Sequence, residues 1–249
     1  NVLDQSAAPY YRWFVGGQTN ACFNLVDRHL LQGRANKTAI IFEGDRLEPG
    51  FSETPGQWGT IWFTQGSTNN ILSNITLKNA TVGMLLTGND GTANPSLTLN
   101  NVQVYNCSNV GILARTGKIT GQNVVINNCG ETAFAGTFGG AYDFTHCTFA
   151  NYGSGHQAPS IRMSNYYEDA NENEQLRPME RADFENCIIY GRIESELGIE
   201  ETENTTFNYK FNNCLMKLKE SDYELSNSTH FTNNIYNEEP EFIQTMDAY

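Results

Sequence analysis

The sequence predicts an all-β fold: a right-handed single-stranded parallel β-helix (a solenoid) that is preceded by a short capping segment. Three observations support this prediction. Short stretches alternate between polar and apolar residues, as in residues 102–105, and a period of two indicates strands. Each stretch ends in Asn or His followed by a small residue, most often Cys. The copies recur at intervals of 18 to 40 residues, which is typical of a solenoid with insertions.

The Asn and His residues mark the predicted corners of the coils. Stacked coils place equivalent side chains about 4.8 Å apart. Amide side chains at one corner can therefore form a ladder that satisfies the backbone groups of the turn. We expect the following residues to form one such ladder: Asn106, Asn128, Asn186 and Asn213, with Asn79, His146 and Asn234 at equivalent corners.

The residue after each corner is expected to point into the coil as a small apolar filler. Five of these residues are Cys107, Cys129, Cys147, Cys187 and Cys214. Free cysteine is among the most buried residue types, and stacked inward side chains rarely have disulfide geometry. Free thiols are therefore preferred over disulfides, which stay the alternative. Gly83 and Gly111 follow a few residues later, where we expect a corner that needs unusual backbone angles.

Two parts are expected along the chain, a capping or junction segment over residues 1–32 and a β-helix domain over residues 33–249. The gap between His146 and Asn186 is long, which predicts a loop insertion near residues 152–181. Within the first part, Leu25, Val26 and Leu30 recur at helical spacing before Gly33. A helix there would cover the open edge of the first coil, as solenoids require. The sequence leaves open whether this part is natural or an artificial junction.

Residues 10–45, YYRWFVGGQTNACFNLVDRHLLQGRANKTAIIFEGD, resemble the N-terminal segment of AMP-forming acetyl-CoA synthetases. The distinctive part of the resemblance is confined to about residues 10–32. The resemblance implies activation of an acid by ATP. However, the chain has no G-x-x-x-x-G-K-[ST] motif or comparable phosphate loop with a lysine, and its remaining length is taken up by coils. We therefore expect no acyl-CoA synthetase activity.

A second resemblance covers about residues 33–242. It rests on the motifs GDRLE, PGQWG-x-I-x-F, NPSLTLNN, HCTFANY, SNYYEDAN, FENCIIYG, FNYKFNNCL and NEEPEF. On these the chain resembles a family of right-handed β-helix surface proteins of gut Bacteroidetes. The resemblance implies the fold, export in the manner of lipoproteins, and a lipid anchor in the full-length precursor. It implies no catalytic residues.

Charge and glycosylation motifs narrow the partners and the location. A formal net charge of −13 disfavours nucleic acid, whose binding needs clustered Lys and Arg. No run of 18 apolar residues exists, so no transmembrane segment is expected. Asn79 and Asn106 begin N-x-[ST] motifs, and glycans there would disrupt the predicted ladder. This fits a bacterial protein that is exported to the cell surface or periplasm.

The predicted insertion supplies the candidate ligand-binding residues. Tyr166 and Tyr167 are adjacent aromatics in the polar stretch SNYYEDANENEQLRPMER, and loops on rigid scaffolds often carry binding function. His156 and Arg162, in GSGHQAPSIRMSN, are similar to the G-H-G and R-I-K elements of polygalacturonases. The N-T-D and D-D carboxylate motifs of those enzymes are missing. An ordinary loop histidine is the alternative for His156.

Two acidic stretches are interpreted more simply as solvated segments than as ligand-binding sites. Asp169, Asn171 and Asn173 form D-x-N-x-N, the start of a calcium loop, but Glu174 stands where the calcium pattern needs Gly. A solvated acidic loop is therefore the default and Ca²⁺ the alternative. The run over residues 194–203, ESELGIEETE, is predicted to be a solvated excursion between coils.

These observations favour an exported cell-surface or periplasmic β-helix module that is non-enzymatic and binds a glycan. No catalytic residues and no cofactor are assigned, Ca²⁺ apart. The alternative is a polysaccharide lyase or glycoside hydrolase that acts on an acidic polysaccharide, since parallel β-helices host such enzymes. The two hypotheses differ in whether two carboxylates converge with His156 or Arg162 in one groove.

Overall fold

The computed structural model describes residue 51 and residues 53–88, 95–153 and 157–243, together with the backbone of three short strands nearer the N-terminus. The chain divides into two compact units, Asn1–Ala39 and Ile40–Tyr249. In the first unit, β1 (Leu3–Asp4) pairs with β2 (Arg12–Trp13) in antiparallel fashion. The predicted capping helix, Cys22 and His156 lie outside the described residues.

The second unit is a parallel β-helix whose coils carry strands on three faces, called A, B and C below. On face A lie β11 (Gly140–Thr145), β16 (Met179–Glu185), β19 (Lys210–Asn212) and β21 (Phe231–Thr232). On face B lie β3 (Ile40–Phe42), β12 (Thr148–Asn151), β17 (Ile188–Gly191), β20 (Leu215–Met216) and β22 (Ile235–Tyr236). The long strands β5 (Asn70–Lys78), β7 (Leu97–Tyr105) and β9 (Lys118–Asn127) bend so that each contributes to A and then to B.

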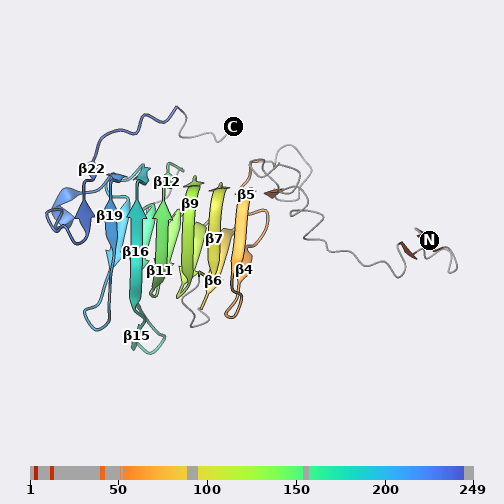
Figure 1. Ribbon diagram of the computed structural model, residues 1–249, viewed down its shortest axis with the longest axis horizontal. Coiled ribbons are helices and arrows are strands. Elements are labelled where there is room, and N and C mark those ends of the chain that lie inside the picture. The colour runs from red at the N-terminus through yellow and green to blue at the C-terminus, as the bar shows by residue number, and fades with distance from the viewer. Residues whose placement is uncertain are drawn as a thin grey trace. The chain divides into compact units, whose positions relative to one another are not determined.

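Face C is a separate six-stranded parallel sheet. Its strands are β4 (Ile61–Phe63), β6 (Val82–Thr87), β8 (Val110–Arg115), β10 (Phe134–Thr137), β13 (Ile161–Ser164) and β18 (Leu197–Glu200). Figure 1 shows successive coils side by side in chain order, from β4 and β5 to β19 and β22. The short 3₁₀ turn η3 (Glu220–Asp222) lies between β20 and β21. No helix among the described residues is long and apolar enough to cross a membrane.

The strand register corrects the prediction of one asparagine ladder, because the predicted members belong to two corners. The corner between faces A and B stacks Asn74, Asn101, Asn123, His146, Asn186, Asn213 and Asn233. The corner that follows face B stacks Asn79, Asn106 and Asn128. Asn106 and Asn128 therefore do not continue into Asn186 and Asn213.

Both stacks share a left-handed backbone, with φ between 53° and 62°, which Asn tolerates better than most residues. Amides link the stacks along the coils. Asn101 donates to Oδ1 of Asn74 at 3.1 Å, and Asn123 to Oδ1 of Asn101 at 3.0 Å. In the last coil Phe231 pairs with Phe211, so Asn233 occupies the corner. Asn234, predicted to be the corner residue, instead accepts a 2.8 Å hydrogen bond from the Cys214 amide.

The five cysteines that the structure describes lie inside the coil as free thiols, each about 1% exposed. They form two columns, because they follow two different corners. One column joins Cys107 to Cys129, and the other places Cys187 between Cys147 and Cys214. Hydrogen bonding to these two neighbours, followed by burial, raises the pKa of the Cys187 thiol. A protonated, buried thiol is chemically inert, which makes Cys187 a packing residue.

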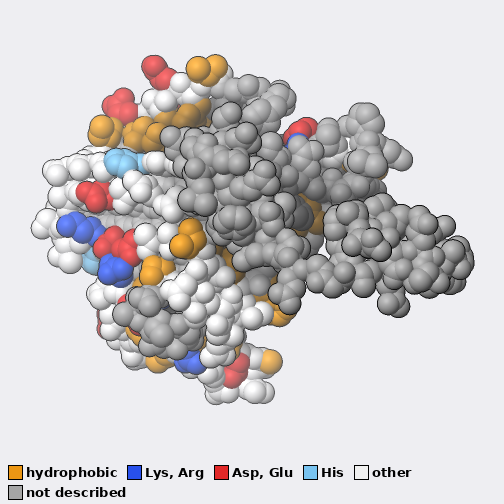
Figure 2. Space-filling view, turned by 45° about the vertical axis from the view of Figure 1, so that its right-hand side comes forward, with side chains coloured by type: hydrophobic (Ala, Val, Ile, Leu, Met, Phe, Trp, Pro, Cys, Tyr) orange, Lys and Arg blue, Asp and Glu red, His pale blue; other side chains and the backbone are white. Residues whose placement is uncertain are grey.

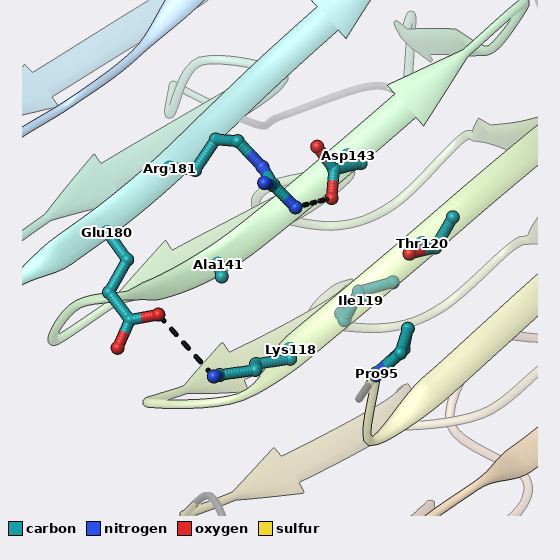
Figure 3. A pocket seen from close by; sticks show the side chains of 8 residues that line it. All are labelled: Pro95, Lys118, Ile119, Thr120, Ala141, Asp143, Glu180 and Arg181. Atoms are coloured by element: carbon teal, nitrogen blue, oxygen red, sulfur yellow. Dashed lines mark hydrogen bonds and ion pairs between the residues drawn. The ribbon is translucent and has the colours of Figure 1, made fainter. Parts of the chain in front are cut away.

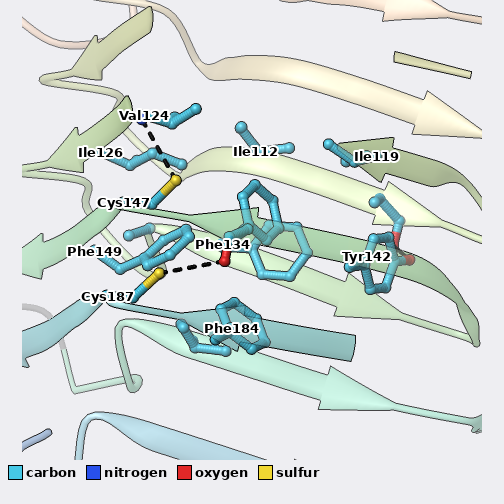
Figure 4. Close-up of a cluster of buried hydrophobic side chains, with 14 of the residues drawn as sticks. Ile112, Ile119, Val124, Ile126, Phe134, Tyr142, Cys147, Phe149, Phe184 and Cys187 are labelled. Carbon is cyan, nitrogen blue, oxygen red and sulfur yellow. Dashed lines mark hydrogen bonds between the residues drawn. The ribbon is translucent and has the colours of Figure 1, made fainter. Parts of the chain in front are cut away.

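Aromatic side chains fill the core beside the second cysteine column (Figure 4). Phe144, Phe184, Phe211 and Phe231 pair in register. Their rings stack at centroid distances of 5.5, 4.9 and 5.8 Å. The column ends at Gly121, where an added Cβ would lie 2.5 Å from Cδ1 of Phe144. Glycine is needed there because the ring occupies the space of a side chain.

Glycine is also needed at positions 83 and 111 because neighbouring atoms leave no room for a Cβ. The backbone angles there do not require it, which corrects the sequence-based expectation. Neither residue belongs to the glycines with positive φ. A Cβ on Gly83 would lie 2.6 Å from the carbonyl oxygen of Gly111, and one on Gly111 would lie 2.3 Å from Cγ2 of Ile126. Real Cβ atoms do not approach so closely, and the two glycines therefore allow face C to pack against the rest of the coil.

The long interval before Asn186 contains a coil strand as well as an insertion. Strand β13 belongs to face C. It is followed by an antiparallel hairpin of β14 (Tyr166–Glu168) and β15 (Glu174–Leu176), which protrudes at the edge of the stack in Figure 1. The hairpin places its side chains next to the outer surface of face C.

The acidic run over residues 194–203 is not a solvated excursion, because it contains β18, a strand of face C. Glu196 within it is fully buried. Its Oε2 accepts hydrogen bonds from the amide and hydroxyl of Ser160 at 3.0 and 2.7 Å. Its Oε1 accepts one from the Ile193 amide at 2.9 Å. These donors offset the cost of burying a carboxylate.

Candidate functional site

Three cavities follow one another across the outer surface of face C. Their volumes are about 420, 570 and 710 Å³. The first and second share Arg115, Phe138 and Tyr167, while the second and third share Arg162 and Glu200. They lie over the strands from β6 to β18, which are four inter-strand steps, or roughly 19 Å. We call this series the face C groove.

The first cavity is built on two aromatic rings and two guanidinium groups. The rings of Tyr167 and Phe138 meet edge to face, with centroids 4.6 Å apart. Cζ of Arg115 lies 5.7 Å from the Tyr167 ring, and Cζ of Arg177 lies 5.0 Å from the Phe138 ring. Such cation–π contacts hold the guanidinium groups in place. Tyr167 is 39% exposed, so its ring is available to a ligand.

The corner that carries these side chains has a strained backbone. Thr116 has a φ of 60° and Phe138 a φ of 69°, and a β-branched or bulky residue rarely adopts the left-handed region. The hydroxyl of Thr116 donates a 2.8 Å hydrogen bond to the carbonyl oxygen of Phe138, which ties the two corners together. Strain of this kind costs stability and clusters at functional sites.

The second cavity brings together three of the four residues predicted to bind a ligand: Tyr166, Tyr167 and Arg162. Glu168 and Glu200 line it as well. Nε and Nη2 of Arg162 donate to Oε1 of Glu200 at 3.1 and 2.7 Å. Arg162 is therefore already paired with a carboxylate. The fourth predicted residue, His156, lies outside the described residues.

The Asp169 carboxylate orders the hairpin turn. Its Oδ1 accepts hydrogen bonds from the amides of Asn171 and Asn173 at 2.9 and 3.0 Å. Its Oδ2 accepts one from Gln175 at 3.0 Å. The Asn171 amide, followed by the Asn173 amide, lowers the pKa of Asp169. The three residues predicted to bind calcium thus make hydrogen bonds within the turn, and the described residues contain no cluster of three His, Cys, Asp or Glu side chains suited to a metal.

Sequence reasoning missed three residues of the groove, Arg115, Phe138 and Arg177, and the neighbouring Trp62. Trp62 is 59% exposed, and its Nε1 donates to the Thr87 hydroxyl at 2.8 Å, beside the first cavity. Arg115 and Thr137 occupy paired positions at the ends of β8 and β10. The signal was the recurrence of T-G, R-T-G and T-F-G at 87–88, 115–117 and 137–139, a third corner that the Asn-Cys frame does not contain.

A fourth cavity, of about 280 Å³, lies on face A (Figure 3). Its charges are paired with one another: Nζ of Lys118 lies 3.5 Å from Oε2 of Glu180, and Arg181 donates to Asp143. Burial, followed by the charge of Asp143, raises the pKa of the neighbouring Asp183. At this cavity face A therefore has the character of an ion-paired surface. Acidic and basic side chains also lie near one another on the described surface that Figure 2 shows.

Comparison with known proteins concerns the N-terminal part of the chain. The family "Acetyl-coenzyme A synthetase N-terminus" matches residues 1–25. Over 44 residues the chain is 61% identical to the acetyl-coenzyme A synthetases of Methylobacillus flagellatus and of Wolinella succinogenes. Over 42 residues it is 55% identical to that of Rhodopirellula baltica.

These matches cover 17 to 18% of this chain and only 6 to 7% of the synthetases. No solved structure matches the chain significantly. The chain therefore has an N-terminal segment that resembles the beginning of acetyl-coenzyme A synthetases, and its second unit is a parallel β-helix.

Proposed function

We propose that this chain is an exported, non-enzymatic β-helix module that binds a polysaccharide along the face C groove. The observation that carries the proposal is the exposed Tyr167 ring, braced edge-on by Phe138 where two cavities of the groove join. Tyrosine presents a flat apolar face with a polar end, which suits a sugar ring that is apolar on one face and rimmed with hydroxyls.

The shape and rigidity of the groove support an extended ligand. It runs across several coils, and the hairpin that supplies Tyr166 and Tyr167 stands on a solenoid scaffold. Binding residues on loops held by a rigid scaffold lose little conformational freedom when they bind. Trp62 adds a second exposed aromatic near the same end of the groove.

The resemblance of residues 33–242 to surface proteins of gut Bacteroidetes supports the proposed location, the bacterial cell surface or periplasm, with a lipid anchor on the precursor. A polysaccharide-binding surface fits such a location because dietary and host glycans are met there. No part of the proposal requires a cofactor or nucleic acid.

A glycan array followed by titration of the hits tests the proposal. The double variant Tyr166→Ala/Tyr167→Ala should lose at least tenfold in affinity for a hit, the equivalent of about 1.4 kcal/mol. The control Ile71→Ala removes another exposed apolar side chain, on face A, and should bind as the parent does. Equal affinity of parent and double variant would exclude the groove.

Polysaccharide cleavage is the second candidate, and one observation favours it. Glu168 and Glu200 line the same cavity as Arg162, and glycoside hydrolysis generally uses two carboxyl groups. The hydrogen bonds from Arg162 to Glu200 count against it, because they hold that carboxylate in an ion pair. A degradation screen that measures new reducing ends and unsaturated uronates tests this candidate. Activity that disappears in Glu168→Gln and in Glu200→Gln would establish it.

A further inference from the structure

The first cavity of the face C groove has an unusual charge for this chain. The whole chain has a formal net charge of −13. Nevertheless, two arginines, Arg115 and Arg177, line this cavity, and no Asp or Glu is among its described lining residues. A concentration of positive charge on an acidic protein indicates a site for an anionic group.

Neither arginine has a carboxylate partner among the residues that the structure describes. Arg162 and Arg181 do, in Glu200 and Asp143. Arg115 contacts the Tyr167 ring, while Arg177 contacts the Phe138 ring and donates one hydrogen bond, from Nη1, to the carbonyl oxygen of Leu176. A guanidinium group carries five N–H donors, so both groups keep donors for a ligand.

We propose that the first cavity binds the anionic group of an acidic polysaccharide, held between Arg115 and Arg177, while the sugar that carries the group packs on Tyr167. This inference rests on the proposed polysaccharide-binding function and specifies its ligand class. Charge-assisted hydrogen bonds from Arg to a carboxylate are among the strongest in proteins. The aromatic rings and the strained corner fix both guanidinium groups before binding, which lowers the entropic cost.

The lining of the second cavity disfavours an anion. We therefore expect the ligand to place one anionic group in the first cavity and none in the second. Glu168 and Glu200 line that cavity, and their charges would repel a second anion. Arg162, the cation in that cavity, is neutralised by Glu200. The sugar that lies over the second cavity is therefore neutral or presents its hydroxyl groups to these carboxylates, which accept hydrogen bonds from them.

Calorimetric titration with oligogalacturonides, with their fully methyl-esterified forms and with sulfated galactan oligosaccharides of equal length tests the proposal. The methyl esters retain the sugar chain but lack the charge. The parent should bind an anionic oligosaccharide at least tenfold more tightly than the methyl ester, and added salt should reduce the difference. Binding to the sulfated form alone would assign the anionic group as a sulfate ester, and binding to the galacturonide alone would assign it as a carboxylate.

Substitutions locate the anionic group. Arg115→Gln and Arg177→Gln should each weaken binding of the anionic oligosaccharide by about tenfold and weaken binding of its methyl ester by a much smaller factor. Arg192→Gln removes the same charge from a residue that lines none of the three cavities. It should bind as the parent does, and the melting temperatures of all variants should confirm folding.

The outcomes separate the two proposals. If the parent binds charged and esterified oligosaccharides equally, or if Arg192→Gln weakens binding as much as Arg115→Gln, the anion site is refuted while polysaccharide binding stands. If the parent binds no glycan on an array that contains both charged and neutral polysaccharides, the proposed function fails and the anion site fails with it.

Discussion

The side-chain amide of Asn106 donates a 2.6 Å hydrogen bond to Oδ1 of Asn79, the residue at the same corner one coil earlier. The same amide donates to the carbonyl oxygen of Glu53 at 2.8 Å. Asn106 is only 6% exposed and has a φ of 57°. One side chain thus joins adjacent coils while its backbone makes the turn.

Asn106→Ala should lower the free energy of unfolding by about 2–3 kcal/mol. It removes the hydrogen bonds to Asn79 and Glu53. Alanine also has no polar side chain to offset the cost of the left-handed backbone. Asn106→Gly should cost less, since glycine adopts that φ freely. Asn101→Ala is the matched control at the exposed stack and should cost less than Asn106→Ala. Urea unfolding measures all three, and equal losses at Asn101 and Asn106 would contradict the importance of burial.

The sequence was sufficient to predict coils but not to assign each corner to its stack. In the first coils both corners carry Asn, five residues apart: Asn74 and Asn79, then Asn101 and Asn106. At Asn186 and Asn213, in later coils, only the first corner carries Asn, since Gly191 and Leu218 stand five residues on. Because the strand segments on faces A and B have similar lengths and the same alternation, a frame of strand, Asn and Cys fits both corners equally well. The N-x₄-N spacing was the signal that separates them.

The candidate site was predicted only in part, for a physical reason. Tyr166 and Tyr167 stand out because adjacent aromatics in a polar stretch are unusual. Arg115 and Phe138 lie on regular coils, where the recurrence of T-G, R-T-G and T-F-G marks a corner but not a binding residue. Only the strand register brings the end of β8 and the end of β10 beside the hairpin. Long-range stacking of this kind is not visible in local sequence.

The inward position of Cys129 leads to a prediction about core polarity. Cys129 is about 1% exposed beside Cys107. Cys129→Asp should destabilise the fold by several kcal/mol, because a carboxylate without partners would enter the core. Cys129→Ala removes only the sulfur and should cost less. Thermal unfolding followed by circular dichroism measures both, and an unchanged melting temperature for Cys129→Asp would place the side chain outside the core.

Asp183 predicts a pH dependence of stability. Burial and then Asp143 raise its pKa. The folded state therefore holds this proton more tightly than the unfolded chain does, and ionisation of Asp183 weakens folding as pH rises from the ordinary aspartate pKa of about 3.9 through the raised value. Asp183→Asn should raise the melting temperature at neutral pH, and the gain should vanish below about pH 3.

The control for this prediction is Asp222→Asn in η3, which should show no such gain. Arg181 also approaches Asp183, with Nε 3.9 Å from Oδ2. A lower melting temperature for Asp183→Asn at neutral pH would show that this ion pair outweighs burial and the repulsion from Asp143.

The hairpin turn predicts insensitivity to calcium. Asp169 already accepts hydrogen bonds from Asn171, Asn173 and Gln175, so the chain's own donors already stabilise the carboxylate charge and order the turn. Calcium should leave the melting temperature unchanged, whereas a bound ligand would raise it. Asp169→Ala should increase protease cleavage within residues 166–176 and leave the coil intact. A calcium-dependent rise in melting temperature that Asp169→Ala abolishes would restore the calcium loop.

The N-terminal segment leads to a prediction about the binding of ATP, acetate and CoA. Its similarity to acetyl-coenzyme A synthetases covers 7% of their length, which is far too little to supply a nucleotide site. Titration of the full chain with ATP, acetate and CoA should therefore show no heat of binding.

We expect residues 10–32 to act as a cap for the β-helix. Trp13, Phe14, Leu25, Val26 and Leu30 supply its apolar side chains, and burial of each is worth about 1.5–3 kcal/mol. A truncated chain that begins at Gly33 would expose apolar surface together with unpaired strand backbone. It should associate on size-exclusion chromatography while its circular dichroism stays rich in β-structure. A monodisperse and equally stable truncation would refute the cap, and saturable ATP binding by the full chain would assign the segment an enzymatic role instead.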